Sequence, residues 1–415
     1  MNPTNEYVPI VLFTGAGASC AKGIELPNMT QFFNQIMDED HNPTDSFIRN
    51  RIYFKYVMDC MYPDKNEDEV YDLEKVLGTL YKLAGTFSDD SAFSIMNENT
   101  LVERISNSVN TLFQDHRKAS LPNELLSKAI ADTMFQRYTE INQSAKDLLH
   151  DLQMLIRKSY SDVNLNGIYE VYGNLFKDLF THSLNSNTNE ENQITLPVFT
   201  VNYDPSIDYV LESSAKKECI DLHTNWRKSV PDYKFANGFT KHEYGSYFVW
   251  RQHAFSMNCN GGVVVPYHKL HGSAIWEKRD GEVMLTTDPV SDLSYMPREF
   301  SMIYPSDKTT PDEDPYSYSH LELDRYIRKT KVLIVIGFAF RDPGIVNVMS
   351  RGLRENPDLR ILVVGPPPNQ WELEFMSFIN HLNVIHVEGF FGDKEVHKEL
   401  ISLVKENLKV KKEVL

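Results

Sequence analysis

Continuous apolar runs recur along the chain, and each is followed by glycine or by polar residues typical of turns. Because these runs lack polar alternation, they favour strands buried on both faces of a parallel sheet. The runs that predict strands are Ile10–Phe13, Leu196–Val201, Gly262–Val265, Val332–Ile336, Leu359–Val364 and Val384–Val387. Apolar residues then recur at helical spacing over Asp393–Leu408, which predicts a closing helix. The pattern predicts an α/β fold with a doubly wound parallel sheet.

The first two predicted strands are separated by a long region with helical periodicity. Its clearest apolar stripes are Leu126, Ile130, Met134 and Tyr138, followed by Leu148, Leu152, Leu155 and Ile156. The polar stretch Asn185–Gln193 resembles a flexible connector back to the sheet. We therefore expect a helical insertion domain at 28–195 and an α/β domain formed by 1–27 and 196–415. Within the α/β domain, 212–260 is expected to be a loop-rich insertion, and Tyr304–Ser319 to be irregular.

Composition narrows the classes of function. Lys and Arg number 42 against 58 Asp and Glu, so the net charge of −16 disfavours direct binding of nucleic acid. The 415 residues contain no apolar stretch of the ~18–20 residues that a membrane span needs. The polar segment Met1–Tyr7 lacks the pattern of a secretory signal, so we expect a cytoplasmic protein. Four scattered cysteines, none in CxxC spacing, favour neither a disulfide framework nor a zinc site, and we expect no metal.

The segment Thr14-Gly15-Ala16-Gly17-Ala18-Ser19 follows the first predicted strand directly. Glycines at such a turn let the backbone approach a pyrophosphate, and the N–H groups of a following helix carry positive potential. The dinucleotide pattern G-x-G-x-x-G is incomplete, because Cys20 occupies its last position. A simple glycine turn between strand and helix is the alternative.

Two further segments place polar residues after predicted strands. In Thr200-Val201-Asn202-Tyr203-Asp204, the side chains of Asn202 and Asp204 would face the crevice at the carboxyl ends of the strands. The alternative is an Asx turn that caps a helix beginning near Pro205. In Tyr267-His268-Lys269-Leu270-His271-Gly272-Ser273, the glycine gives His271 close backbone access and suits it to act as a base, whereas His268 fits a structural role.

The last segment, Val335 to Pro343 (VIGFAFRDP), again ends a predicted strand at a glycine, Gly337. It is consistent with backbone packed against the adenosine half of a dinucleotide. The alternative is a strand-to-helix turn in which Asp342 caps a helix starting at Pro343. Four such motifs at four strand ends together favour a ligand site at one edge of the sheet.

In their order, TGAGAS, TVNYD, KLHGS and VIGFAFRD resemble the GAG(I/A)S, TQN(I/V)D, HG and GTS motifs of the sirtuin family. The resemblance implies a Rossmann-type core that binds NAD. It implies that Asn202 and Asp204 lie in the nicotinamide and water pocket and that His271 is the catalytic histidine. The residues expected to bind the rest of NAD are Gly15, Ala16, Gly17, Ser19, Thr200 and Gly337.

Some residues differ from the sirtuin motifs, and these differences indicate which group of sirtuin-like proteins the chain resembles. Protein-deacylating sirtuins carry a four-cysteine zinc module after HG, whereas 276–288 contains no cysteine here. In GTS, the serine is replaced by Ala339. The chain thus looks like the sirtuin-like NADase effectors of bacterial anti-phage defence, in particular those paired with a HerA-like hexameric ATPase. The resemblance implies hydrolysis of NAD to nicotinamide and ADP-ribose, with abortive infection controlled by assembly with that ATPase.

The expected roles are as follows: Asn202 orients the carboxamide or the water, Asp204 holds the nicotinamide amide, and His271 accepts a proton. We also expect a homo-oligomer, since the apolar periodicity of the insertion favours assembly. Three alternatives remain open. One is a protein deacylase or ADP-ribosyltransferase, which would hand the sugar to an acceptor, and another is a sensor that binds NAD or ADP-ribose without turnover. The third is a role in nucleic-acid processing through an associated ATPase, which the acidic balance of the chain disfavours.

Overall fold

The computed structural model describes residues 6–37, 54, 57–58, 76–80, 143–160, 163–189, 192–212, 220–243, 247–285, 299–303, 313–378 and 383–409. The chain divides into two compact units. The first comprises Met1–Asn28, Arg157–Ile303 and Asp307–Leu415, and the second comprises Met29–Ile156 with Tyr304–Ser306. Within the described residues, no helix is both long and apolar enough to cross a membrane.

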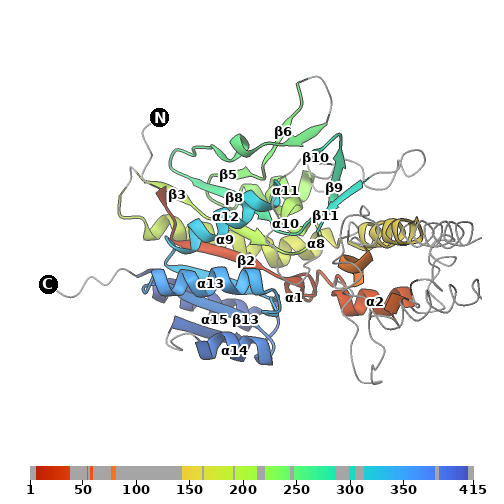
Figure 1. Cartoon of the computed structure of the whole chain (residues 1–415). Helices are drawn as coiled ribbons and strands as arrows, with labels where there is room; N and C mark the ends of the chain where they lie inside the picture. Colours follow the sequence, from red (N-terminus) through yellow and green to blue (C-terminus); the bar gives the residue numbers. More distant parts are fainter. Residues whose placement is uncertain are drawn as a thin grey trace, which may run out of the picture. The chain divides into compact units, whose positions relative to one another are not determined.

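A large parallel sheet forms the centre of the first unit (Figure 1). Nine strands of the described residues belong to it: β1 (Glu6–Tyr7), β2 (Ile10–Thr14), β3 (Gln193–Thr195), β4 (Val198–Thr200), β5 (Tyr233–Ala236), β8 (Val263–Lys269), β12 (Val332–Ile336), β13 (Arg360–Gly365) and β14 (Val384–Glu388). The short strands β1 and β3 precede β2 and β4 and pair with each other, as β2 and β4 do. Pro9 and Pro197 lie at the two interruptions, because proline cannot donate to a strand ladder.

Strand order identifies the type of sheet. The main strands run β8-β4-β2-β12-β13-β14 across it, and every pairing between them is parallel. Numbered along the chain, these strands have the order 3-2-1-4-5-6, which is that of doubly wound dinucleotide-binding folds. The direction of winding reverses between β2 and β12. The predicted α/β fold with a doubly wound parallel sheet is therefore confirmed.

The predicted strands all correspond to observed ones, with shifted ends. The run Leu196–Val201 forms a shorter strand, β4, because Pro197 interrupts it. The run Gly262–Val265 extends to Lys269 as β8, since β4 and β5 provide partners on its two sides. The closing helix is α15 (Lys394–Leu408), as predicted.

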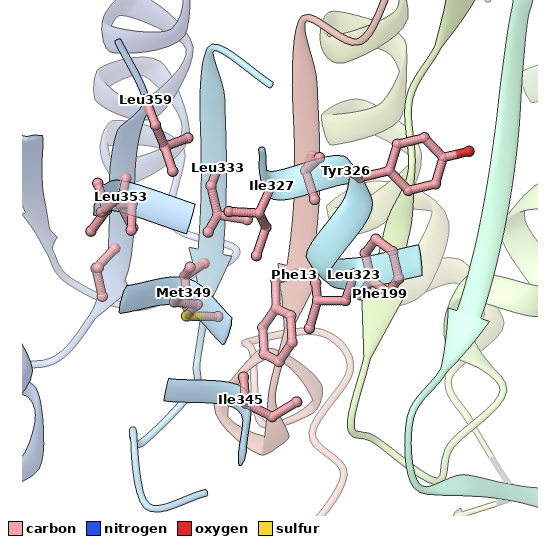
Figure 2. Packing of buried hydrophobic residues seen from close by; sticks show 14 of the residues in the cluster. Phe13, Phe199, Leu323, Tyr326, Ile327, Leu333, Ile345, Met349, Leu353 and Leu359 are labelled. Atoms are coloured by element: carbon pink, nitrogen blue, oxygen red, sulfur yellow. The ribbon is translucent and has the colours of Figure 1, made fainter. Parts of the chain in front are cut away.

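Apolar side chains cover both faces of the sheet. Val11 and Phe13 of β2 belong to a buried cluster with residues of α12 (Tyr316–Ile327) and α13 (Pro343–Glu355). Figure 2 shows Phe13 near Leu323 of α12 and Ile345 of α13. The alternate residues of β2 are buried as well, on the face that α9 (Asn174–Ser186) and α15 cover through contacts with β8 and β12–β14.

A second sheet, antiparallel, was not predicted. In the described residues it has the order β11-β9-β10-β7-β6. Its strands are β6 (Phe239–Lys241), β7 (Phe248–Trp250), β9 (Gly272–Arg279), β10 (Glu282–Leu285) and β11 (Glu299–Met302). The turn Asp280-Gly281 joins β9 to β10 with positive φ at both residues, which is the geometry that Asp-Gly favours in two-residue hairpins. Residues 212–260 thus contain strands and a helix, α11 (Ile220–Arg227), between their loops.

Helices form the described part of the second unit. They are α2 (Met29–Met37), residues 76–80 and residues 143–156, where Leu148, Leu152 and Ile156 are fully buried. The stripe from Leu126 to Tyr138 lies outside the described residues.

The second unit ends earlier than the insertion expected at 28–195. Residues Arg157–Ile303 belong to the first unit, including α8 (Leu165–Ile168), the π-helix η1 (Tyr169–Gly173) and α9. Phe176 and Phe180 of α9 are fully buried, and α9 contacts β8 and α15. This helical segment therefore covers the parallel sheet.

Candidate functional site

The four sequence motifs lie at the carboxyl ends of four neighbouring strands. TGAGAS follows β2, TVNYD follows β4, KLHGS begins at the last residue of β8, and VIGFAFRD follows β12. These strands are adjacent in the order β8-β4-β2-β12. The motifs therefore meet at one edge of the sheet, where doubly wound folds bind their ligands.

The glycine turn after β2 is packed against the turn after β12. The N–H groups of Gly15 and Gly17 donate to the carbonyls of Ile336 and Gly337, both at 2.9 Å. A Cβ on Gly15 would lie 2.7 Å from the Gly337 oxygen, and Gly337 itself has φ +64. These glycines are therefore required by the close approach of two backbone segments. The helix that follows, α1 (Ala16–Ser19), is a single turn, and Ala16 and Gly17 are exposed in it.

The Asn202 side chain joins the turn after β4 to the glycine turn. Its Nδ2 donates to the Gly15 carbonyl at 2.9 Å and to Ser19 Oγ at 2.8 Å. Its Oδ1 is buried and accepts no hydrogen bond from any residue that the structure describes. A buried carboxamide oxygen without a donor is costly, so this atom is suited to accept a hydrogen bond from a ligand.

Asp204 serves the helix cap and the site together. Its Oδ1 accepts a hydrogen bond from the Ser206 N–H at 3.0 Å, at the start of α10 (Ser206–Leu211). This is the Asx turn that the sequence offered as an alternative. Its Oδ2 accepts from Ser19 Oγ at 2.5 Å. Because both oxygens have protein donors, Asp204 orients Ser19, which is also bonded to Asn202.

Thr200 faces inward. Its hydroxyl donates to the Thr14 carbonyl at 3.3 Å, accepts from Thr14 Oγ1 at 2.9 Å and accepts from the Asn202 N–H at 3.0 Å. Tyr172 of the π-helix η1 is fully buried near Asp204, and burial together with the charge of Asp204 raises its pKa. The phenol therefore stays protonated. These contacts give Thr200 a role in shaping the turn that carries Asn202.

His271 is paired with Asp342, which comes from the turn after β12. His271 Nε2 lies 3.2 Å from Asp342 Oδ2, and His271 is 5% exposed. Burial opposes ionisation of Asp342, but its hydrogen bond and charge interaction with His271 and the Ile345 N–H outweigh burial and lower its pKa. Asp342 also caps α13 through that N–H, which is the helix cap that the sequence offered as an alternative.

The His271–Asp342 pair spans two intervening strands. Strands β8 and β12 are separated by β4 and β2, which corresponds to about 14 Å at the usual spacing of ~4.8 Å. The loops after β8 and β12 therefore approach each other across the strand ends that carry Asn202 and the glycine turn. Because Nε2 faces Asp342, Nδ1 is the ring nitrogen left for a substrate hydroxyl or a water.

His320 of α12 lies close enough to interact electrostatically with His271 and Asp342. Burial lowers its pKa, with a further contribution from the charge of His271. Its Nδ1 lies 2.9 Å from the Tyr316 carbonyl. His320 is thus a neutral imidazole beside the pair at neutral pH.

His268 packs between aromatic rings, whereas His271 pairs with a carboxylate. The His268 ring is stacked between Phe199 and Phe255, at centroid distances of 4.9 and 4.5 Å. Burial lowers its pKa to about 3, so it is neutral in the folded protein. The structural role expected for His268 fits this environment.

Sequence reasoning missed several residues of this edge. Asp342 was interpreted only as a cap, because its contact with His271 joins segments far apart in the chain. Lys269 was quoted within KLHGS without a role, because lysine is usually exposed and its buried partners are set only by the tertiary structure. Tyr172 and His320 carry no sequence signal, because each lies on a helix remote from the motifs in sequence.

Among the residues described, no three His, Cys, Asp or Glu side chains are grouped to hold a metal ion. A cavity of about 610 Å³ lies at the other end of the sheet, near the first residues of β5 and β8. It is lined by Arg227, Asp232, Tyr233, Lys234, Asn258, Cys259 and Asn260. None of the four motifs contributes to this cavity.

No protein-family model and no curated protein matches the chain. Solved structures that resemble it include Sir2 homologues. A Sir2 homologue in complex with NAD is 13% identical, with 97% of this chain and 91% of that chain covered and a TM-score of 0.35. One in complex with ADP-ribose is 10% identical, with 97% and 94% covered and a TM-score of 0.37. At such scores, the fold assignment depends on the strand order described above.

Proposed function

We propose that the chain binds NAD at the carboxyl edge of its parallel sheet and hydrolyses the nicotinamide–ribose bond. Water adds to the anomeric carbon as the bond to nicotinamide breaks, so the products are nicotinamide, ADP-ribose and a proton. The observation that carries the proposal is the convergence of the four sirtuin-like motifs on neighbouring strands of a sheet with dinucleotide-binding order.

The reaction passes through a ribose that resembles an oxocarbenium ion, so positioning matters more than covalent help. We assign the unpartnered Oδ1 of Asn202 to the nicotinamide amide or to the attacking water. His271 accepts a proton from that water or from a ribose hydroxyl through Nδ1. Asp342 holds the other ring nitrogen and stabilises the imidazolium that forms.

The remaining predicted residues serve binding in this proposal. Ala16 and Gly17 are exposed and line the phosphates of NAD, while the contact between Gly15 and Gly337 sets the shape of the surface that NAD meets. Asp204 acts on the nicotinamide pocket through Ser19, since both of its carboxylate oxygens already have donors. The Thr200 hydroxyl stabilises the turn that carries Asn202 by accepting a hydrogen bond from the Asn202 N–H.

The biological setting of this activity is a further part of the proposal and rests on the sequence resemblance alone. We propose a cytoplasmic homo-oligomer that acts as an anti-phage effector and is controlled by assembly with a HerA-like ATPase. An unregulated NADase would be toxic, so basal activity of the isolated chain is expected to be low.

The test is to incubate the purified chain with NAD, alone and with a HerA-like ATPase encoded beside it, and to measure nicotinamide and ADP-ribose. Equal amounts of both products, absent with His271→Ala, are expected. Stoichiometric NAD binding without nicotinamide release would favour the sensor. Nicotinamide release with the ribose attached to a protein or acyl acceptor would favour the transferase or deacylase.

A further inference from the structure

Lys269 is a buried lysine at the last position of β8. It is 1% exposed, and its Nζ donates to the Asp204 carbonyl at 2.6 Å and to the Asn202 carbonyl at 3.2 Å. The same ammonium lies 3.6 Å from Asp208 Oδ2. Lysine is rarely buried this completely unless its charge is paired. The groups that contact the Lys269 ammonium therefore indicate the role of this residue.

Asp208 and Tyr267 hold the ammonium in place. Tyr267 Oη donates to Asp208 Oδ2 at 3.1 Å. Tyr267 and Lys269 are two residues apart on β8, so their side chains leave the same face of the strand toward the start of α10. Burial raises the pKa of Asp208, and the charge of Lys269 opposes that rise. The three side chains form one buried group beneath the TVNYD turn.

The KLHGS segment and the first residues of β9 hold three successive carbonyls of that turn. Lys269 binds the carbonyls of Asn202 and Asp204, while the Tyr203 carbonyl between them accepts from the Ala274 N–H at 2.8 Å and from Ser273 Oγ at 3.1 Å. These contacts fix the backbone from which the Asn202 side chain leaves, and that side chain bonds Gly15 and Ser19.

We propose that Lys269 is a positioning residue for the hydrolysis proposed above: its ammonium fixes the Asn202–Asp204 backbone and thereby aims the Asn202 side chain at the substrate. If Lys269 served only to hold β8 against α10, the ion pair with Asp208 would be enough. The two bonds to backbone carbonyls fall instead on the residues that flank Tyr203 in the TVNYD motif. The expected loss of turnover rests on the proposed function. The expected ordering of the Asn202–Asp204 backbone does not depend on it.

The test combines Lys269→Met with Asp208→Asn, which removes both charges while the new carboxamide oxygen can still accept from Tyr267. Lys234→Met, at an exposed lysine of β5, is the matched control. In the full chain with its ATPase, the double variant is expected to lose at least tenfold in kcat with KM for NAD within threefold. The control is expected to keep both constants. Unchanged kcat in folded double variant overturns the proposal.

Hydrogen exchange measured on the same proteins does not depend on turnover. Amides in the peptide covering 198–209 are expected to exchange at least tenfold faster in the double variant, whereas amides of β12 keep their protection. Equal exchange in variant and parent overturns the positioning role, even if the parent releases no nicotinamide.

Should the double variant fail to fold, Tyr267→Phe removes only the hydroxyl that holds Asp208. It is expected to lower kcat two- to fivefold with the same local increase in exchange, and no change in either quantity would equally refute the role.

Discussion

The interior of the parallel sheet and its carboxyl edge are both buried, yet they bury different chemistry. The interior consists of aliphatic and aromatic side chains, such as the fully buried residues of β2 and β12. The edge buries Asn202, Asp204, Lys269 and His271, each in specific polar contacts. Apolar burial stabilises the fold, whereas buried polar groups cost free energy unless their partners are well placed.

This difference indicates that the interior mainly sets the stability of the fold, whereas the carboxyl edge mainly sets turnover. In the interior, the cost of a substitution should follow the volume removed. At the edge, the cost should follow the loss of one directed contact, and should show in turnover more than in melting. The substitutions below test this division, from the largest expected effect to the smallest.

Phe13→Ala should cost the most stability. Phe13 is fully buried on β2 in the cluster with α12 and α13, and such truncations cost about 3–5 kcal/mol. The exposed Leu321 of α12 is the matched control, and Leu321→Ala should change the free energy of unfolding by less than about 0.5 kcal/mol. Denaturant titrations measure both values. Equal effects of the two substitutions would contradict the packing described for the sheet.

His271→Ala and Asn202→Ala should each lower nicotinamide release about 10²–10³-fold, equivalent to about 3–4 kcal/mol of transition-state stabilisation. If both residues act on one transition state, the double variant should lose far less than the sum of the two effects. His253→Ala, at an exposed histidine, serves as the control. Near-parental turnover of well-folded His271→Ala would remove it from the mechanism.

Stability is expected to separate these two variants. Asn202→Ala removes the Nδ2 hydrogen bonds to the Gly15 carbonyl and to Ser19 Oγ and should cost about 1–3 kcal/mol. His271→Ala removes a side chain at the edge of the sheet and should cost less. Thermal melts recorded beside the kinetics distinguish lost catalysis from lost folded protein.

Asp342→Asn tests the carboxylate behind His271. Asparagine is as good a helix cap as aspartate, so α13 should keep its start and the melting temperature should change little. The negative charge that stabilises the imidazolium is lost, and turnover should fall about 10–100-fold. A melting temperature lowered in proportion to activity would instead assign Asp342 to the cap alone.

His268→Leu should change stability least at neutral pH, where His268 is neutral, and its effect should show in the pH dependence of stability. The folded pKa of about 3 lies below the ordinary value of 6.5, so between these values the unfolded chain binds a proton that the folded chain does not. Stability is therefore lost as pH falls below ~6.5, by up to about 1.4 kcal/mol per pH unit. The variant should lose stability less steeply between pH 6 and pH 4.5 in urea titrations. An unchanged slope would show that His268 does not titrate in this way.

Much of the architecture could be predicted, because parallel strands buried on both faces form apolar runs that are visible without any tertiary information. All the predicted runs became strands of the parallel sheet. The antiparallel sheet was missed because strands such as β6 and β7 are short and only partly buried, and their partners are set by long-range pairing. The hairpin turn Asp280-Gly281 was the one local signal that could have revealed part of it.

The sequence by itself determined which segments become the main strands of the parallel sheet and which residues stand at their carboxyl ends, because hydrophobic periodicity and turn residues are local properties. Only the tertiary structure decided which side chains meet there. The pairing of His271 with Asp342, the placement of Lys269 under the TVNYD turn and the contact of Gly15 with Gly337 each join segments far apart in the chain. Strand order creates these contacts, and strand order depends on the winding of the whole sheet.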